Sequence, residues 1–572
     1  MLVGHKTYQR QSLFLVFFVC TLVATILMVR LGYLMLTKAD YYGVKAKELH
    51  ERERTIKAER GKILDRNGNV LAGNVSVSTI SVIHSQVKEP EKVISVLSKE
   101  LGMKEEELRK KVEKVSSREK IKSNVDKEIS DRIRSYKLAG VTVDEDYKRY
   151  YEYGTLGSKV LGFTGGDNQG IIGLEVSYES LLKGLDGSIL TMATAGGVEI
   201  RNGAEDRREP VAGWDLTTSL DLNVMEYATQ VANTLLEQKQ AKTVEIIIMN
   251  PQNGEIYAMV NAPEFDLNHP YELEPEAQTK SQKEKMEILN SRWRNLAVSD
   301  TYEPGSTFKV VTAAAALDLG VVKMTDTFSC PGYKIVEDQR IRCHKTTGHG
   351  AETFEQGIMN SCNPVFMEVG ARVGTSHMFE KMKKFGILEK TGIDVPGEAS
   401  TIMHKQENVG AVELATMSFG QSFQLSPIRM LTSISMIING GKKIVPHFGM
   451  YAVSSDKKTM KKLSYSSSER VLEKSISEEI RKALQKVVTE GGGKKAGVEG
   501  YLVGGKTGTS QKLPRGNGKY IASCIGFSPV DNPQVIAMVR IDEPQGLYYG
   551  GVIAAPAIST LYTNILPYLL KE

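Results

Sequence analysis

A long apolar stretch near the N-terminus places the strongest constraint on how this chain can fold. Ser12 to Val29 are 18 uncharged, mostly apolar residues, and Leu31 to Leu36 continue the stretch beyond Arg30. As a helix, the first 18 residues would be about 27 Å long, which is close to the thickness of a bilayer's hydrocarbon core. The sequence therefore predicts a transmembrane anchor over residues 12–36, and no other segment is expected to be long and apolar enough to span a membrane.

Charged residues beside this stretch predict its orientation. Lys6 and Arg10 precede it, and basic residues are retained on the cytoplasmic side of membrane helices. We therefore expect a cytoplasmic tail over residues 1–11 and a single-pass protein of the cell membrane whose remaining chain is extracytoplasmic. A cleaved signal peptide is the alternative. We favour an uncleaved anchor because Arg30–Met35 offers no small-x-small cleavage site.

The rest of the chain has the composition of globular protein. The whole chain has 572 residues, of which 41% are hydrophobic and 25% charged, so it can form two or more domains with cores of their own. A net charge of +5 from 73 basic and 68 acidic residues is too balanced to indicate nucleic-acid binding. We expect a mixed α/β stem and pedestal over residues 37–215 and an α+β domain over residues 216–572, with a β-hairpin at Glu245–Val260.

The predicted pedestal contains no nucleophile with a neighbouring base. The dipeptide Asn67-Gly68 indicates a hairpin turn between two short strands, and Arg60, Asp65 and Arg66 are expected to form an ion network around it. Residues 89–137 are rich in Lys and Glu and are expected to form a helical insertion with a solvated face. The pedestal is therefore expected to dock or support rather than to catalyse.

The second domain contains a serine and a lysine one helical turn apart. Pro304 and Gly305 indicate a turn, Ser306 stands at the expected start of a helix, and Lys309 follows on the same face. A serine hydroxyl is a weak nucleophile, but a lysine that is desolvated near other cations can lose its proton and act as its base. This spacing alone is common, and a solvated helix pair is the simpler interpretation of an isolated match.

Two downstream motifs make the pattern more specific. In Ser361-Cys362-Asn363, which follows a helical segment from Thr353, Ser361 could relay a proton from Lys309 and Asn363 could hydrogen-bond a substrate amide.

The other motif is a strand-like run whose glycines would let a substrate backbone approach closely. Its polar members are expected to hold a substrate carboxylate. The backbone N–H groups of Ser306 and Thr509 would form an oxyanion hole. The predicted substrate-binding residues are Lys506, Thr507, Gly508 and Thr509.

Three cysteines and a histidine lie between the first two motifs or within the second. Thiolates and imidazole suit a closed tetrahedral zinc site, and we prefer His349 to His344 because glycines on both sides of His349 give its loop freedom. A Cys330–Cys343 disulfide with Cys362 free, or three buried thiols, are the alternatives. The predicted ligands of a structural zinc ion are Cys330, Cys343, His349 and Cys362.

The three motifs in this order resemble those of the class B penicillin-binding proteins, the anchored enzymes that crosslink peptidoglycan. The resemblance also covers the anchor, the Arg60–Gly68 segment and Gly173-Leu174-Glu175. It implies that residues 216–572 have the fold of serine β-lactamases and penicillin-binding transpeptidases, an antiparallel sheet flanked by helices. Some class B relatives also have a comparable metal site.

The resemblance implies D,D-transpeptidation. Ser306 would attack the D-Ala-D-Ala carbonyl of a stem peptide, release D-Ala and pass the acyl group to an amine of a neighbouring stem, and β-lactams would acylate the same serine. No repeat module is expected after the catalytic domain and no glycosyltransferase domain before the pedestal. A separate, polytopic glycan polymerase is therefore the expected partner.

Other functions use part of the same pattern. A D,D-carboxypeptidase or β-lactamase would share the motifs but transfer the acyl group to water, for which the sequence shows no identifiable deacylating carboxylate. A scaffolding subunit of a cell-wall synthesis complex would not need the intact motifs. A β-lactam sensor would need additional membrane and signalling segments.

Overall fold

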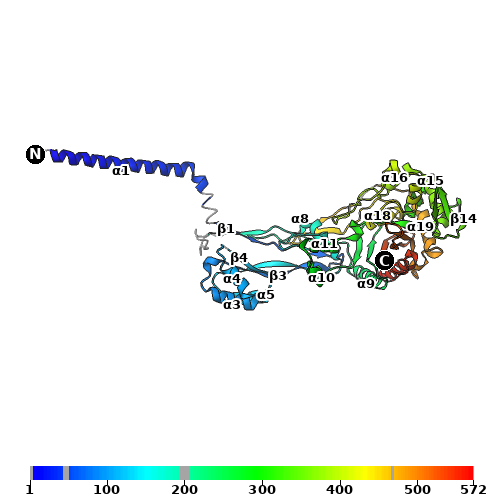
Figure 1. The fold of residues 1–572 in the computed structure, drawn as a ribbon, viewed down its shortest axis with the longest axis horizontal. Coiled ribbons are helices and arrows are strands. Elements are labelled where there is room, and N and C mark those ends of the chain that lie inside the picture. Colours follow the sequence, from blue (N-terminus) through cyan, green and yellow to red (C-terminus); the bar gives the residue numbers. More distant parts are fainter. Residues whose placement is uncertain are drawn as a thin grey trace. The chain divides into compact units, whose positions relative to one another are not determined.

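The computed structural model describes residues 4–42, 45, 51–116, 118–192, 206–465 and 469–570 (Figure 1). Two compact units are present, and each combines several chain segments. The N-terminal unit comprises Met1–Ala58, Ser76–Lys148 and Leu185–Val211. The C-terminal unit comprises Glu59–Val75, Arg149–Gly184 and Ala212–Glu572.

The N-terminal unit contains helix α1 (Gly4–Thr37), a three-stranded sheet and a small α/β core. The sheet is antiparallel, with the order β1-β6-β7. In the core, amphipathic helices bury apolar residues such as Leu97 and Leu108 together with Ile121 of a strand. The elements are β1 (Glu51–Ile56), η1 (His84–Gln86), α3 (Pro90–Leu101), α4 (Glu105–Val112), β4 (Glu119–Asp126), α5 (Lys127–Ser135), β6 (Gly187–Met192) and β7 (Asp206–Arg208).

The expected helical insertion at residues 89–137 is therefore only partly correct. Strand β4 interrupts it and pairs antiparallel with the second half of β3 (Val70–Val82), while β5 (Val141–Tyr150) also pairs with β3. β4 buries Ile121 and Val125 among polar and charged residues. The strand forms because it pairs in a sheet, which the local composition did not reveal.

The core of the C-terminal unit is a five-stranded antiparallel sheet with the order β10-β9-β19-β18-β17. The predicted hairpin at Glu245–Val260 is confirmed by the pairing of β9 with β10. The central strand β19 and the edge strand β10 are buried along their whole length, so helices cover both faces. The strands are β9 (Thr243–Met249), β10 (Ile256–Ala262), β17 (Gly504–Gln511), β18 (Tyr520–Ser528) and β19 (Val535–Asp542).

Two groups of helices pack against this sheet. Helices α9 and α21 contact each other and the strands β9, β10, β18 and β19, while α18 and α19 contact β19 and β17. Helix α13 lies among α15, α16, α18 and α19. The main helices are α9 (Leu222–Gln238), α11 (Gln282–Trp293), α13 (Lys309–Asp318), α14 (Phe354–Met359), α15 (Asn363–Val373), α16 (Thr375–Lys384), α17 (Ala411–Met417), α18 (Pro427–Ile438), α19 (Lys474–Thr489) and α21 (Ala555–Leu569).

Shorter elements complete the unit. A second sheet contains the order β16-β15-β8-β2-β3, and two antiparallel strand pairs, β11 with β14 and the hairpin β12 with β13, lie beside α15. Their bounds are β2 (Ile63–Leu64), β8 (Asp215–Thr218), β11 (Thr327–Cys330), β12 (Tyr333–Val336), β13 (Gln339–Arg342), β14 (Gly350–Thr353), β15 (Gly449–Val453) and β16 (Met460–Lys462). The short helices are α6 (Ser158–Leu161), α7 (Gly173–Ser177), α8 (Glu179–Leu182), α10 (Pro275–Gln278), α12 (Leu296–Ser299), η2 (Gly305–Thr307), η3 (Gln406–Asn408), η4 (Lys494–Ala496) and α20 (Gly550–Ile553).

Helix α1 contains the predicted anchor. Within its segment Arg10–Thr37, the most apolar 18-residue window has a mean hydropathy of 2.7, and none of that window is buried. The expectation that no other segment is long and apolar enough is wrong, because Gly550–Leu569 also qualifies. Its most apolar window has a mean hydropathy of 1.3, but half of that window is buried. This second segment packs on the five-stranded sheet, which leaves α1 as the single candidate anchor among the described residues.

The hairpin turn at Asn67-Gly68 is confirmed, but the ion network predicted around it is wrong. β2 pairs antiparallel with the first residues of β3. The Arg60 guanidinium pairs with Glu175 at 2.6 Å and Glu179 at 2.7 Å, whereas Asp65 accepts the backbone N–H of Asn69. Local spacing could not identify Glu175, because it lies 115 residues away along the chain.

Candidate active site

Ser306 lies in the 3₁₀ turn η2, immediately before α13. The α-helix begins at Lys309, three residues later than the sequence predicted, because residues 305–307 form this tighter turn and Gly305 adopts a φ of +55°. A Cβ atom at Gly305 would lie 3.1 Å from the carbonyl oxygen of Thr509 in β17. Glycine therefore lets the nucleophile turn approach the edge strand of the sheet.

The helix that follows Ser306 is buried by packing. Residues 309–316 are all buried, and a run of alanines allows neighbouring helices to come close. Phe308 is fully buried and meets the Phe423 ring edge to face at 4.7 Å between centroids. Ser306 itself is partly exposed, and its hydroxyl makes no hydrogen bond with any residue that the structure describes.

Four of the predicted polar side chains meet around Ser361. The Lys309 Nζ atom donates to the Ser361 carbonyl oxygen at 2.6 Å, to Asn363 Oδ1 at 2.7 Å and to Ser361 Oγ at 3.2 Å. The Lys506 Nζ atom donates to the same Ser361 Oγ at 2.8 Å. The fold thus joins residues 306–309, 361–363 and 506–509 at one place, with the Ser361 hydroxyl between two amines.

Burial changes the acidity of both amines. Lys309 and Lys506 are only 1% and 2% exposed. Desolvation lowers the pKa of Lys309 to about 8. Desolvation and then the charge of Lys309 lower the pKa of Lys506 well below its ordinary value. Near pH 8, the site can therefore hold an uncharged amine beside a second cation, as a lysine base requires.

Ser361 occupies an unusual backbone conformation. Its φ is 56°, in the left-handed region that a non-glycine residue adopts at a cost of about 1–3 kcal/mol. It follows α14, whose Thr353 and Gln356 form a capping box, as the predicted helical segment requires. The turn is held on its far side by Asn363, whose Nδ2 atom donates to the Arg342 carbonyl oxygen at 3.1 Å. Several contacts therefore fix the Ser361 hydroxyl toward the lysines.

The predicted substrate-binding residues all lie on β17, which is the edge strand of the sheet. Along it, Lys506 and Gly508 are buried, whereas Thr507 and Thr509 are partly exposed. A Cβ at Gly508 would lie 3.1 Å from the carbonyl oxygen of Pro304, so the strand lies directly against the nucleophile segment. An unpaired strand edge next to Ser306 could add an extended peptide by backbone hydrogen bonds.

The four predicted metal ligands also come together. The ligand atoms of Cys330, Cys343, His349 and Cys362 lie within 4.8 Å of one another, and His344 is not part of this group. All five cysteines are free thiols, and those of the cluster are buried. A Cβ at Gly348 would lie 2.3 Å from the Cys330 carbonyl oxygen, so a glycine is needed where the two loops meet.

Comparison with known proteins identifies the family. Residues 244–563 match the model of the penicillin-binding protein transpeptidase domain, and residues 55–218 match the penicillin-binding protein dimerisation domain. Stage V sporulation protein D of Bacillus subtilis is 38% identical over 578 residues, covering 100% of this chain and 87% of that protein. The chain belongs to the penicillin-binding protein family.

Two further similarities agree with this assignment. The protein named "Probable peptidoglycan D,D-transpeptidase PenA" of Neisseria meningitidis is 31% identical over 528 residues, covering 91% of this penicillin-binding protein and 86% of the relative. A crystal structure of a peptidoglycan synthetase from Bifidobacterium adolescentis has a TM-score of 0.73 at 24% identity, covering 90% of this chain and 96% of that one. The latter shows the shared fold, an α+β penicillin-binding transpeptidase domain preceded by a dimerisation-type domain.

The structure of this penicillin-binding protein also contains polar partners that the motifs did not reveal. Arg342 contacts the site through its backbone carbonyl, so its side-chain identity gave no signal. Glu352 is 3% exposed and lies beside His349. The one sequence signal for Glu352 was its position, an acidic residue in a short strand three residues after the predicted ligand His349.

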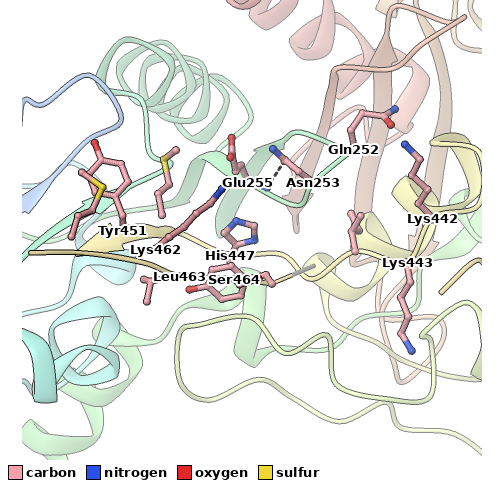
Figure 2. Close-up of a pocket in the computed structure, with 14 residues that line it drawn as sticks. Gln252, Asn253, Glu255, Lys442, Lys443, His447, Tyr451, Lys462, Leu463 and Ser464 are labelled. Atoms are coloured by element: carbon pink, nitrogen blue, oxygen red, sulfur yellow. Dashed lines mark hydrogen bonds between the residues drawn. The ribbon is translucent and has the colours of Figure 1, made fainter. Parts of the chain in front are cut away.

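A separate cavity of about 660 Å³ lies elsewhere in the C-terminal unit (Figure 2). His447 stacks on Tyr465 with 3.9 Å between ring centroids, and Glu255 and Lys462 also line the cavity. None of its lining residues belongs to the three motifs or to the cysteine cluster. It is therefore not part of the site around Ser306.

Proposed function

We propose that this penicillin-binding protein is a membrane-anchored peptidoglycan D,D-transpeptidase that acts through an acyl-enzyme at Ser306. The observation that carries the proposal is the meeting of Lys309, Ser361, Asn363 and Lys506 beside the Ser306 turn. The substrate would be the D-Ala-D-Ala end of a stem peptide, bound in an extended conformation along β17.

In the first half of the reaction, uncharged Lys309 accepts the Ser306 proton as Oγ bonds to the penultimate carbonyl carbon. The oxyanion receives hydrogen bonds from the backbone N–H groups of Ser306 and Thr509. The Ser361 hydroxyl, which contacts both amines, relays the proton to the leaving nitrogen. The C–N bond breaks, D-Ala leaves and the acyl group remains on Ser306.

In the second half, the amine of a neighbouring stem bonds to the acyl carbon and loses a proton through the same groups, and Ser306 is released with its proton restored. Asn363 would orient a substrate amide, and Lys506 with Thr507 and Thr509 would hold the terminal carboxylate, with no side chain at Gly508 to obstruct the backbone. β-Lactams present a reactive amide in place of the scissile bond and would acylate Ser306.

Two measurements test this proposal. After incubation with penicillin, tryptic mass mapping should place one adduct on Ser306, and Ser306→Ala should carry none. With a stem-peptide donor and an amine acceptor, mass spectrometry should detect the crosslinked product. Hydrolysis without crosslinks would indicate a carboxypeptidase instead, and an unlabelled Ser306 would contradict the acyl-enzyme.

We also propose that α1 anchors the protein in the cell membrane with its N-terminus in the cytoplasm. Lys6 and Arg10 precede its apolar segment, in agreement with the positive-inside rule. Protease added outside intact spheroplasts should then remove the C-terminal unit. Since neither matched domain is a glycosyltransferase, we propose that a polytopic glycan polymerase supplies the strands, which co-purification from membranes would test.

For the cysteine cluster we propose one structural zinc ion. Three thiols and an imidazole whose ligand atoms gather within 4.8 Å provide the donor set of a closed tetrahedral site. Cys330, Cys343, His349 and Cys362 would hold the ion, which would stabilise the fold and take no part in the transfer. Because Cys362 lies between Ser361 and Asn363, fixing its side chain would keep both neighbours directed at the cleft. Elemental analysis should find one zinc per chain.

A further inference from the structure

A buried carboxylate connects the cysteine cluster to the turn that carries Ser361. Glu352 lies on β14, which pairs with β11, the strand that ends at Cys330. Its side chain is 3% exposed, so both carboxylate oxygens are shielded from water. A buried carboxylate is costly unless each oxygen has a partner.

The two oxygens of Glu352 face different groups. Oε2 accepts a hydrogen bond from Asn360 Nδ2 at 3.0 Å, and Asn360 directly precedes Ser361. Oε1 lies 3.8 Å from His349 Nδ1, beyond hydrogen-bond distance, and has no hydrogen-bond partner among the described residues. The oxygen without a partner is therefore the one on the side of the predicted metal ligands.

We propose that Glu352 is a positioning residue that couples the metal cluster to the Ser361 turn. This inference rests on the proposed zinc site and adds to it. Oε1 faces the His349 imidazole and restricts the orientation of that ring, as carboxylates beside metal-bound histidines do. Oε2 holds Asn360, so that the residues on both sides of Ser361, Asn360 and Cys362, are fixed from the same cluster.

The backbone of Ser361 explains why two attachments are needed. A φ of 56° is unfavourable for serine, and the surrounding contacts must maintain it. Cys362 holds one end of the turn through the cluster, and Glu352 holds the other through Asn360. Loss of either attachment would allow the Ser361 hydroxyl to move away from Lys309 and Lys506.

Two substitutions separate the two halves of this role. Glu352→Gln keeps an oxygen for Asn360 but replaces the oxygen that faces His349 by an amide nitrogen, which cannot accept a hydrogen bond. Asn360→Ala leaves Glu352 and the four ligands intact but removes the link to the turn. Glu355→Gln is the matched control, because Glu355 lies three residues further along and pairs with Lys486 at 2.6 Å instead of facing the cluster.

The experiment uses the full chain in detergent. Zinc affinity is measured by competition with a chromophoric chelator, ligand geometry by the absorption spectrum of the Co²⁺-substituted protein, and acylation by a fluorescent penicillin at saturating zinc. We expect Glu352→Gln to weaken zinc binding by about 10–100-fold and to shift the Co²⁺ spectrum. Asn360→Ala should keep wild-type zinc affinity and lose acylation rate by about 10-fold or more.

The outcomes distinguish this inference from the proposals it depends on. Wild-type zinc affinity and an unchanged Co²⁺ spectrum in Glu352→Gln would overturn it, as would wild-type acylation in Asn360→Ala or an equal loss in Glu355→Gln. If Glu352→Gln does not fold, Asn360→Ala decides alone. A wild-type protein that binds no zinc would overturn both the metal site and this coupling, while labelling of Ser306 would still support the transpeptidase.

Discussion

The nucleophile segment and the Ser361 turn meet at Lys309, but different interactions hold them in place. Helix α13 is buried by apolar packing along its first two turns. The Ser361 turn adopts a left-handed backbone and depends on Glu352, Arg342 and the cysteine cluster, all of which act through polar groups. The reactive side of the site is therefore supported by the core, and the proton-relay side by a local polar and thiol framework.

This difference matters because the two sides should fail in different ways. Replacing a polar side chain on the packed side should change the chemistry and leave the fold in place, since the core around α13 does not depend on that side chain. A substitution in the framework around Ser361 should change local stability and chemistry together. The following predictions test this contrast in order of expected effect.

The largest effect is expected from replacing the amine on the packed side. Lys309→Met removes the proposed base but keeps a side chain of similar length, so acylation by penicillin should fall by about 10²–10⁴-fold while the fold is retained. Stopped-flow acylation and circular dichroism check both parts. The exposed substitution Lys405→Met is the control. A Lys309→Met protein that acylates within a few-fold of wild type would show that another group is the base.

The next largest effect is a pH dependence of the acylation rate, which results from the ionisation of Lys309. With a pKa of about 8, Lys309 is uncharged in about one molecule in a hundred at pH 6, so the acylation rate should rise about 10-fold per pH unit and level off above pH 8. Rates measured from pH 6 to 9.5 test this. A flat profile in the wild-type protein would contradict a role for an uncharged Lys309.

The lowered pKa of Lys309 also predicts that the stability of the fold depends on pH, because proton binding is linked to unfolding. The unfolded lysine, with its ordinary pKa of 10.5, binds more protons than the folded one between about pH 8 and 10.5. The free energy of unfolding should therefore rise with pH across this window relative to that of Lys309→Met, and the difference should be constant below it. Denaturant titrations of both proteins at pH 7, 8.5 and 10 measure the difference. A relative fall in stability would contradict the lowered pKa.

On the framework side, losing the metal should reduce rate and stability together. Chelation or Cys362→Ala is expected to slow acylation by about 10-fold and to lower the melting temperature, because the Ser361 turn loses one attachment. Acylation and thermal unfolding are measured on samples whose zinc content is known. The buried Cys524→Ala serves as a cysteine control outside the cluster. Unchanged acylation after confirmed metal removal would show that the turn does not need the ion.

The smallest effect is expected on β17, where binding is divided among several groups. Thr507→Val keeps the shape of a partly exposed side chain and removes one hydroxyl, so the specificity constant for a D-Ala-D-Ala donor should fall by about 2–10-fold. The melting temperature should stay the same. A loss beyond about 100-fold would mean that Thr507 contacts the reacting atoms rather than the substrate carboxylate.

Much of the fold could be predicted because it depends on local patterns. The apolar run that forms α1, the Asn-Gly turns of the β2–β3 and β9–β10 hairpins, and the strand β17 all follow from short-range composition. Strand β4 was missed because its burial comes from pairing with β3, and α13 begins later than expected because the preceding residues form a 3₁₀ turn.

The sequence by itself determined which chemical groups are present: an anchor, a serine with a lysine one turn away, two further polar motifs and four soft or borderline metal donors. Only the tertiary structure decided that Lys309 and Lys506 share the Ser361 hydroxyl, that Arg60 pairs with Glu175, and that Glu352 lies beside His349. The physical reason is that motif spacing records side-chain types along the chain, whereas these contacts depend on how packing brings the side chains together.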